Sequence, residues 1–439
     1  WKMLMESLAA GRSISLPSQA QSAAELALRA ASAYGGIREQ FGLEIGKFEG
    51  IKEKLSSIAG HAYVMNSARR LAFGAVDAGE KPSVISAIVK AYLTEGARKC
   101  INDAMDIHAG AAICRGPANI YARPYNAIPI GITVEGANIL TRSLIVFGQG
   151  AIRCHPFILQ EMQAVQTKDV SAFDKAFFGH LKHVLCTIGR ALFHQLTLGL
   201  FLSSPVSGAA SQHYKKVNRY TLAFALIADI CLATLGGSLK RKEYLSGRLS
   251  DAFAWLFLIS AALKDFHDKN SPEAERPLLE WTCRHGFCQI EQALIGVLDN
   301  LPNRPIAGLT KIILFGLSKR EKPVSDRLRD AIVDSLNNPS IRRSLTSNVY
   351  IPSQDETGLG NLEATYSQVQ ATAAIRKKII TARKSGKIAK SDRLTMAKNA
   401  YDQGIITELE FREISEAEAL RKIAIEVASF TPQDHKGVH

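Results

Sequence analysis

Two short glycine-containing segments hold the residues whose types and spacing best suit chemistry. The first, GGIREQFGLEIGKFEGI from Gly35 to Ile51, places Arg38 and Phe41 among glycines. A guanidinium can bind a phosphate through two hydrogen bonds, and glycine lets the backbone approach a ligand closely. The segment therefore suits contact with a phosphate and a flat ring. The alternative is a solvated loop in which Arg38 has a structural role.

The second segment, GITVEGANILTRSLI from Gly131 to Ile145, places Glu135 where a proline-broken apolar stretch meets a new helix. Ile132, Val134 and Gly136 flank this carboxylate. Desolvation raises the pKa of a carboxylate in an apolar pocket, which suits such a group to act as a general base near neutral pH. We predict this role for Glu135. The alternative is an acidic residue at a helix N-terminus, stabilised by the helix dipole.

Other common catalytic and ligand-binding patterns are absent from the sequence. It has no Gly-x-Gly-x-x-Gly fingerprint, no Walker loop and no Gly-x-Ser-x-Gly elbow. Its seven cysteines follow no paired spacing, which is typical of reduced thiols in a cytosolic protein. Cys283, His285 and Cys288 have an irregular spacing for metal ligands, so we expect a structural role for them and no metal site. Several histidines lie singly on helical patterns and are expected to be ordinary core or surface residues. They are His61, His108, His180, His183 and His194.

The composition predicts a helical protein around these segments. The chain has 439 residues, of which 46% are apolar and 22% are charged, and these values exclude a disordered, collagen-like or disulfide-dense chain. Aromatic residues make up only 7%, and alternating strand-like runs are scarce, which argues against a sandwich or barrel. We therefore predict an all-α protein of two or three domains.

Apolar residues at helical spacing indicate which helices must position the two segments. Ile51, Leu55, Ile58, Ala62 and Met65 recur at steps of four and three and so share one helical stripe. Helices are also expected over residues 4–33, 83–111 and 138–147, about four more between 172 and 317, and one from 407 to about 430, which Thr407 and Glu410 begin as a capping box. The three prolines between residues 114 and 133 predict a loop or distorted connection there.

One apolar segment, residues 221–239, is long enough to raise the question of a membrane span. Asp229 lies in its middle, where an unpaired carboxylate in hydrocarbon costs several kcal/mol, and Gly236 and Gly237 suit a helix end. We therefore expect a buried core helix.

The positive charge of the chain raises the question of an anionic partner. The formal net charge is +13, and eight lysines and arginines gather between Arg376 and Arg393. Such a cluster can neutralise phosphates, but no aromatic interleaving or nucleic-acid motif accompanies it, so we expect a solvated helix face and no nucleic-acid partner. A basic surface can also attach to an anionic lipid leaflet. A basic helical scaffold or binding module for such surfaces is the alternative to an enzyme.

The order of the two segments resembles the acyl-CoA dehydrogenase family, in which Arg-x-x-Phe-Gly, Asp-Ala-x-x-Ile-x-x-Gly and Glu-Gly-Ala/Thr follow one another. This sequence has the matching residues Arg38, Phe41 and Gly42, then Asp103, Ala104, Ile107 and Gly110, then Glu135, Gly136 and Ala137. Later segments, including HPFILQEMQAV and ERPLLEWTCRHGFCQIEQALIGVLDNLPNRP, resemble the helical extension of the bacterial fatty-acid-degradation (FadE) type. The resemblance implies the C-terminal helical domain of the family over residues 1–154. The extension would cover 155–349, and a linker with a charged helical part would cover 350–439.

The resemblance implies an enzyme of fatty-acid β-oxidation that oxidises a fatty acyl-CoA to trans-2-enoyl-CoA with FAD. Glu135 would be the base, and its backbone N–H would also bind the thioester oxygen. Arg38, Phe41, Gly110 and Gly136 would contact FAD, partly across a subunit boundary, which implies a homodimer. Arg12, in the pair Gly11-Arg12, would lie near the acyl-CoA. An electron-transfer flavoprotein is the partner that the family usually employs.

Some positions depart from the family pattern. Asp106 and Ala109 stand where many relatives have Gln and Gly, and an acidic Asp106 at the cofactor would repel its pyrophosphate. Glu49 replaces a frequent Gln, and Ala137 replaces a Thr. The N-terminal and middle domains of the family are not in this sequence, so we expect a fragment that binds FAD poorly and cannot turn over alone. We expect a cytoplasmic location, with peripheral contact to the inner membrane.

Overall fold

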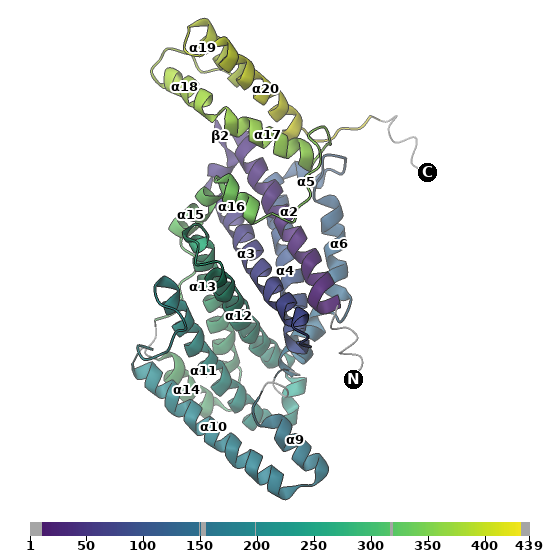
Figure 1. Ribbon diagram of the computed structural model, residues 1–439, viewed down its shortest axis with the longest axis vertical. Coiled ribbons are helices and arrows are strands. Elements are labelled where there is room, and N and C mark those ends of the chain that lie inside the picture. The colour runs from purple at the N-terminus through teal and green to yellow at the C-terminus, as the bar shows by residue number, and fades with distance from the viewer. Residues whose placement is uncertain (1–10, 149, 151–154, 198, 317–318, 432–439) are drawn as a thin grey trace. The chain divides into compact units, whose positions relative to one another are not determined.

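The computed structural model describes residues 11–148, 150, 155–197, 199–316 and 319–431. Within these residues the chain forms helices and one hairpin of two short strands (Figure 1). The predicted all-α fold is therefore confirmed.

The elements up to residue 147 carry the two segments that the sequence singles out. They are η1 (Gly11–Ser15), α2 (Leu16–Ile37), β1 (Glu39–Gln40), β2 (Leu43–Glu44), η2 (Ile45–Lys47), α3 (Glu49–Asp77), α4 (Ser83–His108), α5 (Gly110–Ile113), α6 (Ala122–Thr133), α7 (Asn138–Leu140) and η3 (Thr141–Phe147). The predicted stripe lies on α3, where Leu55, Ile58, Ala62 and Met65 are buried.

The rest of the chain is also helical. It contains α9 (Ile158–Thr167), α10 (Val170–Leu196), α11 (Ala209–Leu235), η4 (Gly236–Arg241), α12 (Glu243–Asp268), η5 (Glu273–Glu275), α13 (Arg276–Leu298) and α14 (Arg304–Phe315). The last helices are α15 (Asp326–Leu336), α16 (Pro339–Ser344), α17 (Leu359–Ala371), α18 (Ala373–Lys384), α19 (Arg393–Asp402) and α20 (Glu408–Ile425). The predicted capping box of Thr407 and Glu410 begins α20.

The chain falls into two compact units, each built from three separate segments. Unit 1 consists of Trp1–Gln21, Gly60–Ala97 and Ile128–Ile332. Unit 2 consists of Ser22–Ala59, Arg98–Ala127 and Val333–His439. Each unit thus combines early and late parts of the sequence. These units are compact in space, whereas the boundaries predicted near residues 154 and 349 divide the sequence into consecutive domains. Those boundaries stay a prediction.

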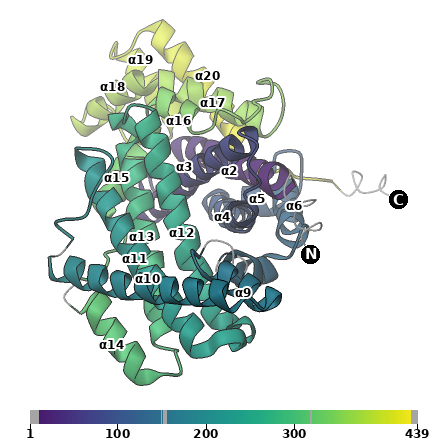
Figure 2. The same cartoon turned by 60° about the horizontal axis from the view of Figure 1, so that its bottom comes forward.

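Unit 1 packs its helices through small and aromatic residues. Gly60 on α3 lies against Trp281 on α13, and a Cβ atom at Gly60 would be 2.1 Å from the indole ring, so no larger residue fits. Helices α4, η3 and α12 share an apolar cluster. Its buried members are Val84, Ala87, Ile88, Ile145, Val146 and Ala254. Figures 1 and 2 show α10 crossing α11, and α10 contacts α9, α11 and α14.

Unit 2 joins α2 to residues more than 300 positions later in the chain. The guanidinium of Arg342 makes two hydrogen bonds to the Glu363 carboxylate, one of them 3.0 Å long, and both residues are 5% exposed. Arg29 on α2 donates to the same carboxylate at 2.6 Å, and its C=O accepts from Arg342 at 2.7 Å. A buried carboxylate shared by two guanidiniums thus ties α16 and α17 to α2.

The expectation of a loop over residues 114–133 is wrong for its second half, which forms α6. Pro124 lies in the first turn of this helix, where a backbone N–H has no intrahelical partner to lose. Pro129 lies inside the helix and removes one donor without ending it. Proline therefore marks the start of a helix here and not a break.

The apolar segment at residues 221–239 forms the second half of α11 and most of η4. Asp229 is 5% exposed, and its Oδ1 lies 3.1 Å from Nε2 of His155. Helix α11 contacts α10, α12 and α13 of the same unit. By length and composition alone, one described helical segment, Ala209–Arg241, could cross a membrane, or two if α6 and the 138–147 helix form one bent span. The pairing of Asp229 with His155 favours the predicted core helix, whereas only 39% of the apolar window is buried, so the buried core helix stays a prediction.

Candidate active site

Glu135 and Gly136 form a tight turn between α6 and α7 in unit 1. Both residues have positive φ, 54° at Glu135 and 95° at Gly136. A Cβ atom at Gly136 would lie 2.8 Å from Nη2 of Arg12 and 3.4 Å from Oγ1 of Thr141. Glycine is therefore required at this position by both its dihedral angle and its neighbours.

Lys90 on α4 holds the turn from inside the protein. Its side chain is fully buried, and Nζ donates to the C=O groups of Ile132 (3.1 Å) and Gly136 (2.8 Å) and to Oδ1 of Asn138 (2.8 Å). Burial, together with the positive charge of Arg12, lowers the pKa of Lys90 to about 8, although two nearby carboxylates act in the opposite direction. Lys90 thus fixes both ends of the turn.

Arg12 of η1 holds the turn from the other side. It is 3% exposed, and its Nε donates to the C=O of Glu135 at 2.6 Å. Burial lowers the pKa of Arg12, while the charge of Glu135 acts to raise it. Within the described residues Arg12 therefore supports the Glu135 peptide, and the predicted contact of Arg12 with acyl-CoA stays a prediction.

Asn138 at the start of α7 links the turn to α4. Its Nδ2 donates to Oγ1 of Thr94 at 2.9 Å and to Oε1 of Glu95 at 3.0 Å, while its Oδ1 accepts from Lys90. The turn therefore rests on a buried polar network and not on packing alone.

The Glu135 carboxylate keeps one oxygen outside this network. Its Oε2 is buried and has no hydrogen-bond partner among the described residues. Within the same part of the chain, the backbone N–H of Glu135 has no acceptor. The carboxylate oxygen can accept a proton from a bound group, and the backbone N–H of the same residue can stabilise the negative charge that develops on that group.

The predicted cofactor loop forms a β-hairpin in unit 2. Strands β1 and β2 pair antiparallel, with Glu39 opposite Glu44 and Gln40 opposite Leu43. The two turn residues between them have positive φ, 55° at Phe41 and 82° at Gly42. Two such residues make a type I′ turn, which matches the twist of the strands.

Phe41 stands out at the tip of this hairpin. Its side chain is 95% exposed, and its ring makes an edge contact with Phe48 at a centroid distance of 6.4 Å. A phenylalanine with positive φ is strained, and because its ring is exposed it contributes little packing energy to offset that strain. Both features suit a side chain that contacts a group outside this chain.

Arg38 is fixed at the base of the hairpin. Its N–H donates to the C=O of Tyr34, and its C=O accepts from Ile45, both at 2.8 Å.

The Tyr34 ring stacks on His108 at a centroid distance of 4.1 Å. Burial lowers the pKa of His108 to about 3, because its hydrogen bond to Ala104 only partly offsets the loss of solvent.

Asp106 and Gly110 lie near the end of α4 in the same unit. The Asp106 carboxylate is 3.2 Å from Nζ of Lys54, which also donates to Asp103 at 2.7 Å. The repulsion expected from Asp106 is therefore offset by a lysine. A Cβ atom at Gly110 would have no neighbour within 4 Å, so the surface around this glycine is open.

Two family descriptions match this sequence along nearly its whole length. The description "Acyl-CoA dehydrogenase, C-terminal domain" matches residues 1–147. The description "Acyl-CoA dehydrogenase, C-terminal, bacterial type" matches residues 152–430, which is more than half of the chain. The chain belongs to the acyl-CoA dehydrogenase family.

Individual members of the acyl-CoA dehydrogenase family are more distant. "Probable acyl-CoA dehydrogenase FadE10" of Mycobacterium bovis is 25% identical over 298 residues, which cover 66% of this chain and 45% of the relative. "3-(aryl)acrylate reductase" of Clostridium sporogenes is 34% identical over 109 residues, 24% of this chain and 28% of the relative. The chain thus spans less than half the length of these relatives.

A solved structure shares the fold of this acyl-CoA dehydrogenase chain. It is an acyl-CoA dehydrogenase complexed with FAD from Bacillus anthracis, with a TM-score of 0.58 and 16% identity. The match covers 78% of this chain and 56% of that protein.

The basic cluster that the sequence singles out is partly neutralised in this acyl-CoA dehydrogenase chain. Arg376 lies 3.1 Å from Glu44, and Arg393 lies 3.0 Å from Glu418. Lys378 pairs with Glu410 at 2.5 Å. These ion pairs stabilise unit 2 internally, so the cluster presents less charge to solvent than its sequence indicates.

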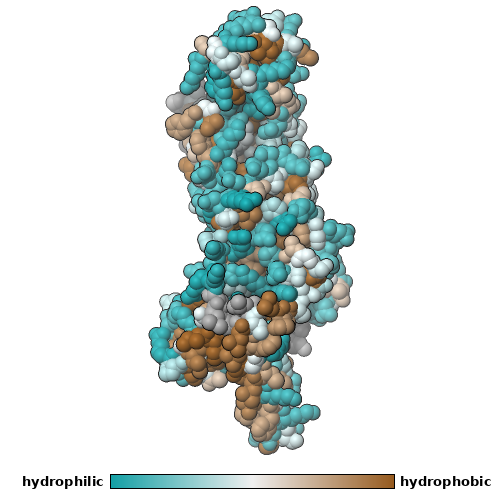
Figure 3. Space-filling model, turned by 90° about the vertical axis from the view of Figure 1, so that its left-hand side faces the viewer, coloured by the Kyte–Doolittle hydropathy of each residue, from teal (hydrophilic) through white to brown (hydrophobic). Residues whose placement is uncertain are grey.

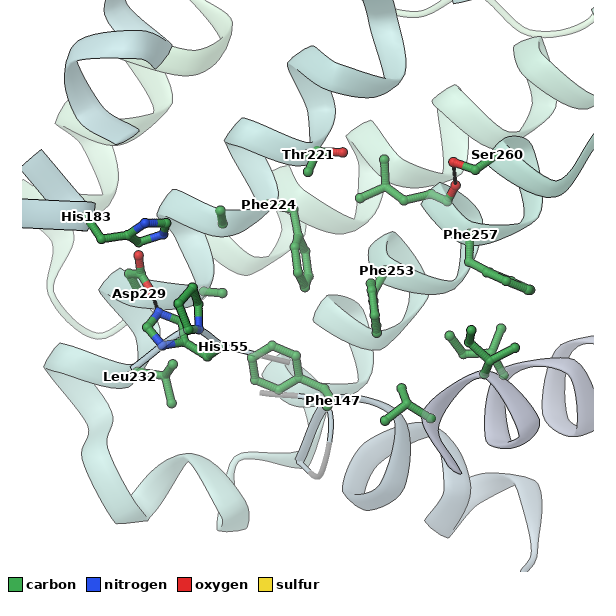
Figure 4. Close-up of a pocket in the computed structure, with 18 residues that line it drawn as sticks. Phe147, His155, His183, Thr221, Phe224, Asp229, Leu232, Phe253, Phe257 and Ser260 are labelled. Carbon is green, nitrogen blue, oxygen red and sulfur yellow. Dashed lines mark hydrogen bonds and ion pairs between the residues drawn. The ribbon is translucent and has the colours of Figure 1, made fainter. Parts of the chain in front are cut away.

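A cavity of about 540 Å³ lies elsewhere in unit 1 (Figure 4). Four aromatic side chains line it, with His155, His183 and Asp229 at one end (Figure 4). The aromatic residues are Phe147, Phe224, Phe253 and Phe257. Glu135 does not line this cavity, so it is separate from the turn described above.

The polar end of the cavity has the residue types of a metal site but not the hydrogen bonding of one. Ligand atoms of His155, His183 and Asp229 lie within 4.8 Å of one another. However, Nδ1 of His155 accepts the N–H groups of Phe157 and Ile158, both at 3.2 Å, so its Nε2 carries the proton that Asp229 accepts. A neutral ring used in this way has no free lone pair for a metal. We interpret the cluster as a support for the start of α9.

The sequence patterns single out Glu135 and Gly136 but not Lys90 and Asn138. Lys90 stands in the run AIVKAYL, where it is the one charged residue between apolar neighbours. A lysine on the apolar face of a helix is a signal that could have been used, because such a charge needs several buried acceptors.

Proposed function

We propose that this chain is the C-terminal part of a flavin-dependent acyl-CoA dehydrogenase that oxidises a fatty acyl-CoA to trans-2-enoyl-CoA. The observation that carries the proposal is the Glu135 carboxylate, which has a buried oxygen without a partner in a turn held from both sides. The family of the chain supports the same reaction class.

In this proposal Glu135 removes the proton from the carbon next to the thioester. The C–H bond breaks, the proton passes to a carboxylate oxygen of Glu135, and negative charge develops on the thioester oxygen. The N–H of Glu135 donates to that oxygen and lowers the energy of the charged state. Lys90 and Arg12 keep this N–H in place because they hold the C=O of Ile132 before it in the chain and the C=O groups of Glu135 and Gly136 after it.

FAD, when bound, accepts the hydride that leaves the neighbouring carbon. The hairpin residues Arg38 and Phe41, with Gly110, would hold it. The open surface at Gly110 and the exposed ring of Phe41 fit such a contact, and Lys54 offsets the charge of Asp106. Gly136 would lie beside the cofactor.

We further propose that the enzyme acts as a homodimer and passes its electrons to an electron-transfer flavoprotein. The exposed, left-handed Phe41 supports the dimer, because a partner subunit that bound this ring would offset its strain.

The test is Glu135→Gln in the complete enzyme that carries this chain. The amide has nearly the same size but cannot take the proton, so flavin content should be normal while the dehydrogenation rate falls about 10²- to 10⁴-fold. The control is Glu80→Gln, because Glu80 is exposed after the end of α3 and should not affect the rate. Activity of Glu135→Gln within a few-fold of the wild type would remove Glu135 from the role of base.

A further inference from the structure

The outward face of α10 in unit 1 is apolar. Phe178 is 64% exposed, Leu185 is 60% exposed and Leu196 is 72% exposed. These residues are seven and eleven positions apart, so they lie on one side of the helix. The opposite side, at Ala176 and Ala191, is buried in the unit. A helix at a protein surface normally has polar residues on its outward side, so this arrangement needs an explanation.

The exposed apolar surface extends beyond α10. Val165 at the end of α9 is 63% exposed, and Leu309 and Ile312 on α14, which contacts α10, are 62% and 69% exposed. Leu200 and Phe201, just after α10, are 73% and 69% exposed. Figure 3 shows hydrophobic residues gathered in its lower part, at the level where Figure 1 draws α10 and α14. We call the exposed apolar residues of α9, α10, α14 and residues 200–201 the α10 face. It is too continuous to be a set of unrelated exposed side chains.

Positive charges follow one edge of the α10 face. Lys175, Lys182 and Arg190 are all exposed. At 100° per residue they lie on the same side of the apolar stripe, whereas Asp174 lies toward the other side. Within the described residues these three cations make no ion pair, in contrast to Arg376 and its neighbours in unit 2.

We propose that the α10 face docks on the surface of an anionic lipid bilayer, with its phenylalanine and leucine side chains among the acyl chains and its three cations at the headgroups. An apolar helix side bordered by lysine and arginine is the arrangement of helices that lie in a membrane interface. The exposed apolar residues of the face are mostly Phe and Leu, which are among the residue types that such helices bury at the boundary of headgroups and acyl chains. This inference goes beyond the proposed reaction, since it concerns where the enzyme works and not what it does.

The first test replaces the apolar side chains. The variant Phe178→Ser, Leu185→Ser, Leu196→Ser should bind vesicles of equal parts phosphatidylcholine and phosphatidylglycerol at least tenfold more weakly than the wild type in a flotation assay. Its melting temperature should not change, because all three side chains are exposed. The matched control is Tyr350→Ser, Leu409→Ser, Ile423→Ser, whose side chains are 80%, 65% and 58% exposed in unit 2 and which should bind as the wild type does.

The second test replaces the cations. Lys175→Gln, Lys182→Gln, Arg190→Gln should bind the anionic vesicles no better than vesicles of phosphatidylcholine alone. The control removes the same charge from the basic cluster, as Lys377→Gln, Lys384→Gln, Lys387→Gln, three residues that are also exposed. This control should keep its preference for anionic vesicles.

Three results would overturn the proposal. They are a wild-type chain that does not float with anionic vesicles, a serine variant that floats as the wild type does, and a cluster control that loses as much binding as the α10 variant. A serine variant that changes from dimer to monomer in size-exclusion chromatography without any change in vesicle binding would assign the face to a second copy of the chain. These assays need neither flavin nor acyl-CoA, so their outcome is independent of the test of Glu135.

Discussion

The Glu135 turn and the tip of the Phe41 hairpin have the same backbone conformation, but the first is half-buried and the second is exposed. Each consists of a non-glycine residue with φ near 55° followed by a glycine with a larger positive φ. The Glu135 turn is held by Lys90 and Arg12 from within unit 1. The Phe41 turn joins two short strands, whose Glu39 and Glu44 pair with Arg421 and Arg376, and its ring is in solvent. A strained pair of residues can thus be stabilised by internal hydrogen bonds or by hairpin geometry.

The difference bears on what each turn can do. The internal network holds the Glu135 peptide through several hydrogen bonds, which suits a group that must meet a reacting atom in a fixed geometry. The hairpin tip leaves Phe41 free to meet another surface. We therefore expect changes in the network to lower the free energy of unfolding strongly, whereas changes at the tip should alter it by about 1 kcal/mol or less and act mainly on contacts outside the chain.

The largest effect is expected from Lys90→Met. This variant removes the Lys90 donor from the C=O groups of Ile132 and Gly136 and from Oδ1 of Asn138, of which Gly136 keeps a hydrogen bond from Thr141. The free energy of unfolding should fall by about 3 kcal/mol. Denaturant unfolding measures this. The control is Lys99→Met on the same helix, whose side chain is 50% exposed and which should cost less than about 1 kcal/mol. Equal losses in the two variants would contradict the role of Lys90.

The two glycines that follow the strained residues provide a matched pair. Gly136→Ala must adopt a positive φ and also displace Arg12, whereas Gly42→Ala meets no atom within 4 Å. We expect Gly136→Ala to lower the free energy of unfolding by about 2 to 3 kcal/mol and Gly42→Ala by about 1 kcal/mol. The same loss in both would show that Arg12 does not constrain the Glu135 turn.

A smaller effect concerns the aromatic support of the hairpin. The unfolded chain binds a proton at His108 near pH 6.5, but the folded chain does so only near pH 3, so stability falls as the pH drops from 6.5 toward 3. Between pH 7 and pH 5 this amounts to about 1 to 2 kcal/mol. His108→Phe keeps an aromatic ring against Tyr34 without titrating. Its free energy of unfolding should therefore change less over this interval, and an unchanged pH dependence would rule out His108 as the cause.

The smallest effect is expected from Phe41→Gly. Glycine adopts the left-handed conformation without strain, and the ring contributes little packing because it is exposed. The free energy of unfolding should rise by up to about 1 kcal/mol. In the complete enzyme the same variant should retain less flavin, if Phe41 holds the cofactor as proposed. A clear loss of stability would show instead that the ring supports the hairpin.

The sequence predicts the helices and several local features well, because these depend on neighbouring residues. The stripe on α3 and the capping box of α20 follow directly from spacing. The loop expected in place of α6 shows the limit of such rules, since Pro124 in a first turn and proline at a helix end look the same in sequence.

Contacts between residues far apart in the sequence are harder to predict. The pairing of Asp229 with His155 and of Arg376 with Glu44 joins residues 74 and 332 positions apart, and no local pattern connects them. The same holds for Lys90 and Gly136, 46 positions apart. Glu135 could be singled out because a family motif contains it, whereas the residues that hold its turn follow only from the fold.

The shared carboxylate of Glu363 in unit 2 has a consequence for biosynthesis. Arg29 leaves the ribosome long before Glu363 and Arg342 do, so α2 must wait for most of the chain to be translated before its buried guanidinium finds its counter-charge. During that interval the surface of α2 that later packs against α16 and α17 stays exposed on the nascent chain.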